Sequence, residues 1–294
     1  GVAPWSILAL TFTNKAAREM RERTEALIGC DAQDMWVTTF HSCCSRMLRM
    51  DITRLGRESN FLIYDDDDQM SLIGNILKRL GISDKDLPKR EIKERISDAK
   101  NKSLDPEQYL MENPYLDEAV IRVFREYQRA LKECNALDFD DLLCMTIQLL
   151  ENCPDVLDKY RRKFNYVLVD EYQDTNSLQY RMIELICREH RNICVVGDDD
   201  QSIYGWRGAD VHNILDFEKD YPDATVIKLE QNYRSTANIL DAANQVIAHN
   251  EGRNHQTAED QVVGIEGLLI DLHEHVSHVP VGSALAEADE ERTQ

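Results

Sequence analysis

Five short apolar runs, separated by stretches with helical spacing, most strongly limit the folds open to this chain. The runs occupy residues 6–12, 36–40, 166–169, 193–196 and 225–229. Each is almost continuously apolar, a pattern typical of strands in a parallel sheet that is covered on both faces. Helical patterns over residues 14–28 and 178–190 lie between the runs, and the first ends at Gly29, a typical helix C-cap. The alternation of strands and helices predicts an α/β domain with a parallel sheet.

Residues 59–137 follow a different pattern. After an apolar run at 61–64, this stretch holds no convincing strand and is rich in Lys, Glu and Asp. Four apolar residues recur at helical spacing, namely Val120, Phe124, Tyr127 and Leu131. We therefore expect a helical insertion between two strands of the sheet. The consecutive Asp residues at 65–68 allow a metal site, but they favour a solvated turn or the start of a helix.

The charge balance and the cysteines limit the function classes. The chain carries 34 Lys and Arg against 54 Asp and Glu, a net charge of −20. A protein that coats nucleic acid would be basic overall, although a local groove with aromatics and a few cations is compatible with this balance. Eight cysteines without a C-x-x-C pair favour reduced thiols of a cytoplasmic protein over disulfides or a zinc site. No apolar run of about 18 residues occurs, so we expect no membrane span.

The strongest chemical signal surrounds the third apolar run, in the sequence FNYVLVDEYQDTN. Asp170 and Glu171 directly follow this predicted strand, at the edge of a parallel sheet where ligands bind. In a nucleotide-hydrolysing site, a first carboxylate holds Mg²⁺ and a second activates the attacking water. An exposed acidic turn is the alternative interpretation of an apolar run followed by two acids. The continuation YQDTN favours the nucleotide site.

The fourth apolar run leads into a second candidate segment, GDDDQSIYGWRGAD, at residues 197–210. Gln201 is placed to hydrogen-bond a terminal phosphate or the attacking water beside the first carboxylates. Tyr204 and Trp206, with Arg207 adjacent, form a candidate stacking platform for single-stranded bases. A pair of aromatics is otherwise most often part of a core, but the flanking glycines argue against burial in a regular element.

Three further segments complete the candidates. Two of them end a predicted strand and begin a helix, and they hold Phe12, Thr13, Asn14, Phe40 and His41. Hydroxyls, amides and the N–H groups of a helix N-terminus suit contacts with a phosphate backbone. The third segment follows the fifth run and holds Tyr233 and Arg234. An Arg in this place can reach a γ-phosphate, although most such Arg form surface salt bridges.

The motifs TFTNKAA, TFHS, VDEYQDTN, VGDDDQSIYGWRGAD and LEQNYRST occur in this order. Together they resemble the UvrD/PcrA/Rep group of superfamily-one DNA helicases, from residue 6 to about residue 250. The resemblance implies a partial RecA-like P-loop NTPase domain, α/β with a parallel sheet, in which the helical insertion is subdomain 1B. It also implies a motor that uses ATP and Mg²⁺, moves 3′ to 5′ on single-stranded DNA and unwinds duplex DNA in repair or replication.

The resemblance further implies a role for each candidate residue. Asp170 and Glu171 would hold Mg²⁺ and activate water. Gln201 and Arg234 would sense the γ-phosphate, and Tyr233 would stack near the adenine. The DNA contacts would come from Phe12, Thr13, Asn14, Phe40, His41, Tyr204, Trp206 and Arg207, the last of which would link the DNA and nucleotide sites.

The sequence departs from the family pattern in two respects. No Gly is followed by Lys, so the phosphate-binding loop G-x-x-x-x-G-K-[ST] is absent. The later motifs, with a second Arg for the phosphate, are also missing. We therefore expect a helicase fragment that is inactive by itself. Its expected parts are domain 1A at 1–58 and 138–224, insertion 1B at 59–137, the start of domain 2A at 225–253 and an unassigned acidic tail at 254–294.

The tail differs in composition from the rest. From residue 251 onward, ten acidic residues accompany only Arg253 and Arg292, and two glycines interrupt the apolar run at 262–270. We expect this tail to pack loosely and the family likeness to stop near Arg253. Two alternative functions stay open: a non-catalytic DNA-binding or regulatory module, and the helicase part of a helicase–nuclease.

Overall fold

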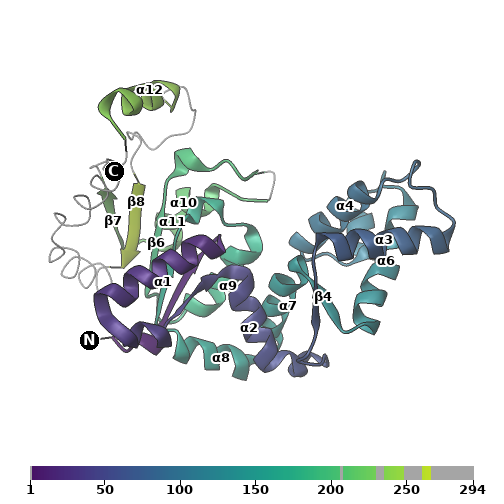
Figure 1. The fold of residues 1–294 in the computed structure, drawn as a ribbon, viewed down its shortest axis with the longest axis horizontal. Coiled ribbons are helices and arrows are strands. Elements are labelled where there is room, and N and C mark those ends of the chain that lie inside the picture. Colours follow the sequence, from purple (N-terminus) through teal and green to yellow (C-terminus); the bar gives the residue numbers. More distant parts are fainter. Residues whose placement is uncertain (1, 206–207, 230–234, 248–259, 266–294) are drawn as a thin grey trace, which may run out of the picture.

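A six-stranded sheet lies at the centre of the α/β part of the molecule (Figure 1). The computed structural model describes residues 2–205, 208–229, 235–247 and 260–265. In spatial order the strands are β2-β1-β5-β6-β8-β7. Their bounds are β1 Ile7–Thr11, β2 Trp36–Thr39, β5 Tyr166–Val169, β6 Ile193–Gly197, β7 Ala224–Leu229 and β8 Asp260–Ile265. β2, β1, β5 and β6 run parallel, and β8 is antiparallel to both β6 and β7. The predicted α/β class and the five predicted strands are confirmed.

Helices connect these strands. Those of the α/β part are α1 Asn14–Ile28, α2 Phe40–Asp51, α7 Phe139–Asn152, α8 Pro154–Lys163, α9 Ser177–Cys187, α10 His212–Leu215, α11 Phe217–Asp220 and α12 Ala237–Ile247. Short 3₁₀ turns are η1 Pro4–Ser6, η2 Gly29–Asp34, η3 Ile52–Leu55, η4 Tyr172–Asp174 and η5 Asp199–Gln201. Local capping defines α1, because the Thr13 hydroxyl accepts the Ala16 N–H at 3.1 Å and Gly29 ends the helix at a φ of 76°.

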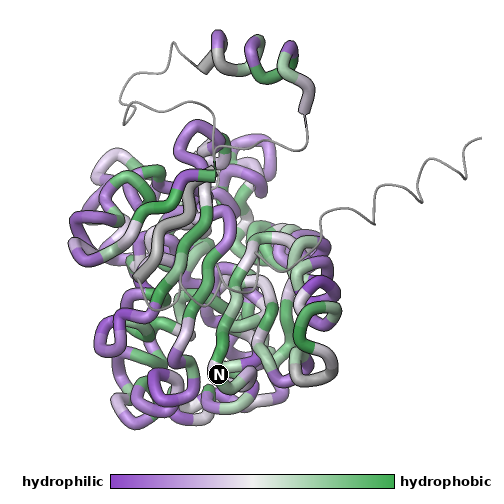
Figure 2. Tube along the Cα trace, turned by 90° about the vertical axis from the view of Figure 1, so that its left-hand side faces the viewer, coloured by the Kyte–Doolittle hydropathy of each residue, from purple (hydrophilic) through white to green (hydrophobic). Residues whose placement is uncertain are grey.

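One face of the sheet carries the main hydrophobic core. Alternate residues of the central strands, such as Leu10, Val167 and Val195, pack with α2, α7, α8 and α9 on this face. The opposite face holds a smaller cluster around Cys194, with Leu168 beside it, and α1 packs against β1 and β2. Figure 2 shows the hydrophobic residues along the central strands and hydrophilic residues on the surrounding helices and loops. This core fixes the strand ends that carry the candidate site.

The insertion is a separate helical layer beside the α/β part (Figure 1). Its helices are α3 Asp66–Leu80, α4 Lys89–Asn101, α5 Pro106–Glu112 and α6 Glu118–Glu133, and they share a second hydrophobic core. The chain enters through β3 Leu62–Tyr64 and leaves through β4 Ala136–Asp138, which pair in parallel. The acidic run is the start of α3, where Asp65 caps the helix and exchanges hydrogen bonds with Asp68. The predicted helical insertion and helix start are therefore confirmed.

The expectation of a loosely packed tail is wrong for residues 260–265. They form β8, which lies between β6 and β7 and pairs with β7 along its length and with β6 at residues 261–264. Val262, Val263 and Ile265 are β-branched and favour a strand, and hydrogen bonding on both edges outweighs the cost of Gly264. β8 also brings β7 into the central sheet. The separation of residues 225–253 as the start of a second domain stays a prediction.

The described residues show the state of the cysteines and the length of the apolar helices. Seven of the eight cysteines are described as free thiols, namely Cys43, Cys44, Cys134, Cys144, Cys153, Cys187 and Cys194, and five of these seven are buried. Burial raises the pKa of Cys44 to about 12, and the thiol is therefore protonated at neutral pH. No helix in the described part is both long enough and apolar enough to cross a membrane.

Candidate nucleotide and DNA site

The acidic turn, residues 170–174, begins where β5 leaves the sheet. The Asp170 N–H donates to the Leu10 carbonyl at 2.9 Å, which continues the pairing of β5 with β1. The next residue, Glu171, has the left-handed backbone angles φ 52° and ψ 44°. This conformation is uncommon for a residue other than glycine and clusters at functional sites. It ends the strand abruptly and leaves the Glu171 side chain exposed at the carboxyl edge of the sheet.

Gln173 connects the acidic turn to the end of β6. Its Nε2 donates to Glu171 Oε2 at 2.9 Å, and its Oε1 accepts the Asp198 N–H at 3.1 Å. Only 1% of Gln173 is exposed, so both hydrogen bonds lie in a protected setting. The sequence motif contained Gln173, but the residue had no predicted role. Its function as a bridge depends on two strand ends meeting in space, which spacing along the chain does not reveal.

Gln201 joins the same network through Asp198. Its Nε2 donates to Asp198 Oδ2 at 2.8 Å, and the other oxygen of Asp198 accepts the Asp200 N–H at 3.0 Å. The structure therefore connects Gln201 to Glu171 through Asp198 and Gln173. The sequence predicts that Gln201 lies beside Asp170 and Glu171, and in the structure Gln201 is linked to Glu171 through these two intermediate side chains.

Asp174 adds a protonatable group to the acidic turn. Burial, and then the charge of Glu171, raise the pKa of Asp174 to about 6. Its Oδ1 atom is buried and has no hydrogen-bond partner among the described residues. The acidic turn thus holds several carboxylate oxygens in a small region, and such hard donors suit a divalent cation such as Mg²⁺.

Gly197 allows the Gln173 bridge to form. A Cβ atom at Gly197 would clash with Gln173 Oε1 and would lie 3.0 Å from Ile214 Cδ1 and 3.1 Å from the Tyr172 backbone nitrogen. We expect Gly197→Ala to lower the free energy of unfolding by about 1–3 kcal/mol, the usual cost of overpacking. Gly205→Ala is the control, since a Cβ there meets no atom of the described residues within 4 Å beyond its chain neighbours. Urea denaturation measures both variants, and equal stability of the two would contradict the tight fit at Gly197.

The loop after β6 is anchored to the acidic turn. The Asp210 N–H and the Asn213 side-chain amide both donate to the Thr175 carbonyl, at 3.0 and 2.9 Å. Asn176 and Ala209 form an isolated antiparallel bridge. Tyr204, in the same loop, is 38% exposed and is thus accessible to a base. Its two predicted partners, Trp206 and Arg207, lie outside the described residues, as do Tyr233 and Arg234.

The ends of β1 and β2 present the remaining candidates. Thr13 and Asn14 are exposed at the start of α1, and Phe12 is half-buried. Phe40 is only 1% exposed and packs against Phe12 with ring centroids 5.5 Å apart. The Phe40 ring therefore belongs to the core and supports Phe12, and the contact of Phe40 with DNA stays a prediction. His41 is half-buried, and burial lowers its pKa, so the imidazole is neutral at pH 7.

Phe139 is an exposed aromatic that the sequence reasoning missed. It is the first residue of α7 and is 44% exposed. Its ring stands edge-on to His41, with centroids 5.8 Å apart. An apolar residue directly after the helix-capping Asp138, followed by more Asp, is the signal that could have identified it. Through its contact with His41, Phe139 adds a third segment to the candidate DNA contacts.

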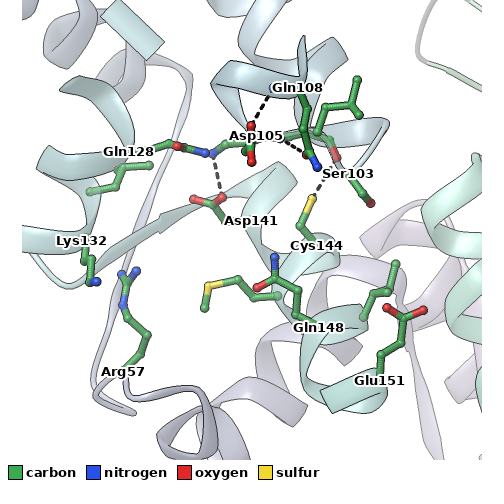
Figure 3. A pocket seen from close by; sticks show the side chains of 15 residues that line it. Arg57, Ser103, Asp105, Gln108, Gln128, Lys132, Asp141, Cys144, Gln148 and Glu151 are labelled. Atoms are coloured by element: carbon green, nitrogen blue, oxygen red, sulfur yellow. Dashed lines mark hydrogen bonds and ion pairs between the residues drawn. The ribbon is translucent and has the colours of Figure 1, made fainter. Parts of the chain in front are cut away.

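A cavity of about 570 Å³ lies elsewhere, between the insertion and α7. Figure 3 shows Gln108 and Gln128 from the insertion and Asp141, Cys144 and Gln148 from α7 around it. None of the predicted nucleotide or DNA residues lines this cavity. The candidate site is instead an open edge of the sheet.

Comparisons with known proteins agree with this arrangement. Residues 1–222 match the UvrD/REP helicase N-terminal domain, and residues 227–278 match the UvrD-like helicase C-terminal domain. The second match extends beyond Arg253, so the expected end of the family likeness at that residue is wrong.

Individual relatives are similar over most of the chain. The ATP-dependent DNA helicase PcrA of Bacillus subtilis is 54% identical over 253 residues, which are 86% of this chain and 34% of that protein. The corresponding PcrA proteins of Staphylococcus epidermidis and Staphylococcus aureus are 53% and 52% identical over the same share of this chain, and 35% of each is covered. The chain spans about a third of the length of these curated relatives. With its parallel sheet, its helical insertion and its acidic strand-end turn, the chain belongs to the UvrD/PcrA/Rep family of superfamily-one helicases.

Proposed function

We propose that this chain is part of an ATP-dependent DNA helicase that moves 3′ to 5′ on single-stranded DNA and unwinds duplex DNA in repair or replication. The observation that carries the proposal is the direct connection between the acidic turn and the loop with Tyr204. Gln173 and Thr175 make this connection through hydrogen bonds to Asp198, Asp210 and Asn213. A motor needs such a connection, because nucleotide hydrolysis must respond to the presence of DNA. The free, mostly buried cysteines suit the cytoplasm, where DNA is also found.

The nucleotide would bind at the carboxyl edge of the sheet. Asp170 and Glu171 would hold Mg²⁺, which neutralises charge on the phosphates when bound. The carboxylate oxygens and the unpartnered Asp174 Oδ1 fit such a cation. Glu171 would accept a proton from the attacking water, and Gln201 would hydrogen-bond the terminal phosphate or that water. Arg234 would also approach the phosphate, and Tyr233 would stack near the base of the nucleotide.

Single-stranded DNA would pass over the loops that follow β1, β2 and β6. The contacts proposed for it are the exposed or half-buried residues Phe12, Thr13, Asn14, His41, Phe139 and Tyr204, together with Trp206 and Arg207, which lie outside the described residues. Stacking on aromatic rings contributes about 1–3 kcal/mol per base, and such sites combine it with local cations, which do not require a basic net charge. This mode of binding is compatible with the net charge of −20.

We expect the 294-residue chain by itself to hydrolyse ATP negligibly. It contains no Gly-Lys pair, so the loop that cradles the phosphates would have to come from polypeptide outside these residues. Phosphate release with and without single-stranded DNA measures this, with Glu171→Gln as the background. Release clearly above that background would show that these residues suffice for hydrolysis.

The proposed function is tested with a full-length protein that contains these residues. Two partial duplexes are compared, one with a 3′ and one with a 5′ single-stranded tail. We expect ATP-dependent strand separation from the 3′-tailed substrate only. Separation from the 5′-tailed substrate would refute the direction, and separation from neither would refute the helicase function.

A further inference from the structure

Asn101 is the last residue of α4 and the point where the insertion contacts the acidic-turn region. Its Oδ1 accepts a hydrogen bond from Asn176 Nδ2 at 3.3 Å, and its backbone carbonyl accepts one from the Ser177 hydroxyl at 3.3 Å. Its Nδ2 donates to Asp140 Oδ1 at 3.2 Å, in the first turn of α7. One half-buried side chain thus joins three helices that are distant in sequence.

The side-chain oxygen of Asn176, the partner of Asn101, already accepts another hydrogen bond. Its Oδ1 accepts the Gln179 N–H at 2.9 Å and thereby caps α9, and Gln179 Oε1 accepts the Asn176 N–H at 3.0 Å. Asn176 directly follows Thr175, whose carbonyl holds the loop after β6. The position of Asn176 therefore sets where the acidic turn ends and where that loop is anchored.

The end of α4 is itself held firmly. Lys100, the neighbour of Asn101, is buried and forms ion pairs with Asp138 at 2.6 Å and Asp141 at 2.7 Å. These pairs attach α4 to α7 and leave the Asn101 side chain aimed at Asn176. A displacement of the insertion would therefore act on the α9 N-cap through the Asn101–Asn176 hydrogen bond.

We propose that Asn101 is a positioning residue that fixes the Asn176 cap. By fixing this cap, Asn101 holds the acidic turn and the loop after β6 in place, and it thereby transmits the position of the insertion to the nucleotide site. The second half of this proposal rests on the proposed helicase function. Asn101 contacts neither nucleotide nor DNA in this account, and its effect passes through Asn176.

The first experiment uses the 294-residue chain and does not depend on ATP. Hydrogen exchange is measured at the backbone N–H groups of Gln179 and Asp210, which bond to Asn176 Oδ1 and the Thr175 carbonyl. Asn101→Ala is expected to speed exchange at both by about three- to tenfold, the effect of losing one or two hydrogen bonds. Asn101 Nδ2 also donates to the Ser97 carbonyl, four residues earlier, at 2.9 Å. Asn113→Ala is the matched control, because Asn113 Nδ2 likewise donates to the Tyr109 carbonyl at 2.9 Å, and among the described residues its side chain forms no hydrogen bond to α7 or α9.

A second variant tests the same contact from its other side. Asn176→Ser keeps a good N-cap and removes the amide that donates to Asn101. The double variant, Asn101→Ala with Asn176→Ser, should speed exchange at Asp210 no more than either single substitution. The reason is that each single substitution already removes the same hydrogen bond between the two side chains. Additive effects would show that Asn101 acts by another route, and unchanged exchange in Asn101→Ala would overturn the proposal.

The second experiment measures ATP hydrolysis by a full-length protein that contains these residues. Asn101→Ala is expected to lower the DNA-stimulated kcat by about three- to tenfold and to leave the KM for ATP within about twofold, since the nucleotide contacts are intact. Faster exchange with an unchanged kcat would overturn the link to the nucleotide site. Faster exchange in a protein whose unsubstituted form shows no DNA-dependent hydrolysis would refute the helicase function and confirm the positioning role alone.

Discussion

Replacing Glu171 with Gln in a full-length protein is expected to cut ATP turnover by roughly 10²–10⁴, the usual contribution of a general base. The amide keeps the size of the carboxylate and can still accept the hydrogen bond that Gln173 Nε2 donates at 2.9 Å. The bridge to Asp198 and the nucleotide affinity should therefore be retained, while the ability to accept a proton from water is lost. Steady-state phosphate release and binding of a fluorescent ATP analogue measure the two quantities.

Glu189→Gln serves as the control for this experiment. Glu189 is exposed, pairs with Arg161 and lies away from the acidic turn. Its replacement should leave turnover within about twofold, because surface ion pairs contribute little. A loss of less than about tenfold in Glu171→Gln would show that Glu171 is not the general base.

Replacing Lys100 with Met should have the largest effect on stability, about 3–5 kcal/mol, the cost of leaving a buried charge without its partner. The Lys100 side chain is 4% exposed and that of Asp138 is 1% exposed. Burial lowers the pKa of Lys100, but the charges of Asp141 and Asp138 outweigh it, and its pKa lies above the usual range. The Tyr127 hydroxyl donates to Asp138 Oδ2 at 2.9 Å and completes the network. Chemical denaturation of the 294-residue chain measures the loss.

Lys102→Met is the matched control, two residues further along the chain. Lys102 pairs with Asp98 at 2.9 Å, but both side chains are about half exposed, and its loss should change stability by about 0–1 kcal/mol. Equal effects of the two substitutions would contradict the buried network at Lys100.

The pH dependence of Lys100→Met gives a further check. Without the cation, Asp138 and Asp141 lose the interaction that favours their charged forms, and their pKa values rise in the folded protein. A carboxyl group with a raised folded pKa binds protons more tightly in the folded than in the unfolded state, so the variant should regain stability as the pH falls from about 7 to 5. Burial already raises the pKa of Asp141 to about 6 in the unsubstituted protein, which places the change in this window.

The strands and α1 could be predicted from sequence because their determinants are local. Continuous apolar runs mark the buried strands, and the cap at Thr13 and the glycine at position 29 set the limits of α1. The position of the acidic turn follows in the same way from the end of β5. Local sequence patterns are therefore sufficient to predict a feature whose position depends only on where a strand ends.

The remaining features depend on tertiary contacts that no local pattern encodes. Phe12 and Phe40 follow equivalent strand ends, but only packing decides that Phe40 belongs to the core. The bridging role of Gln173 needs the ends of β5 and β6 side by side, and Asn101 meets Asn176 across 75 residues of sequence. β8 forms because two neighbouring strands offer it hydrogen-bond partners, despite its internal glycine.

In the proposed function, the acidic turn and the loop with Tyr204 form one unit that couples ATP hydrolysis to single-stranded DNA. The most direct test is the rate of phosphate release by a full-length protein that contains these residues, measured while single-stranded DNA is added. We expect a rate that rises by at least about tenfold and saturates as the DNA site fills. A rate that is the same with and without DNA would contradict this coupling.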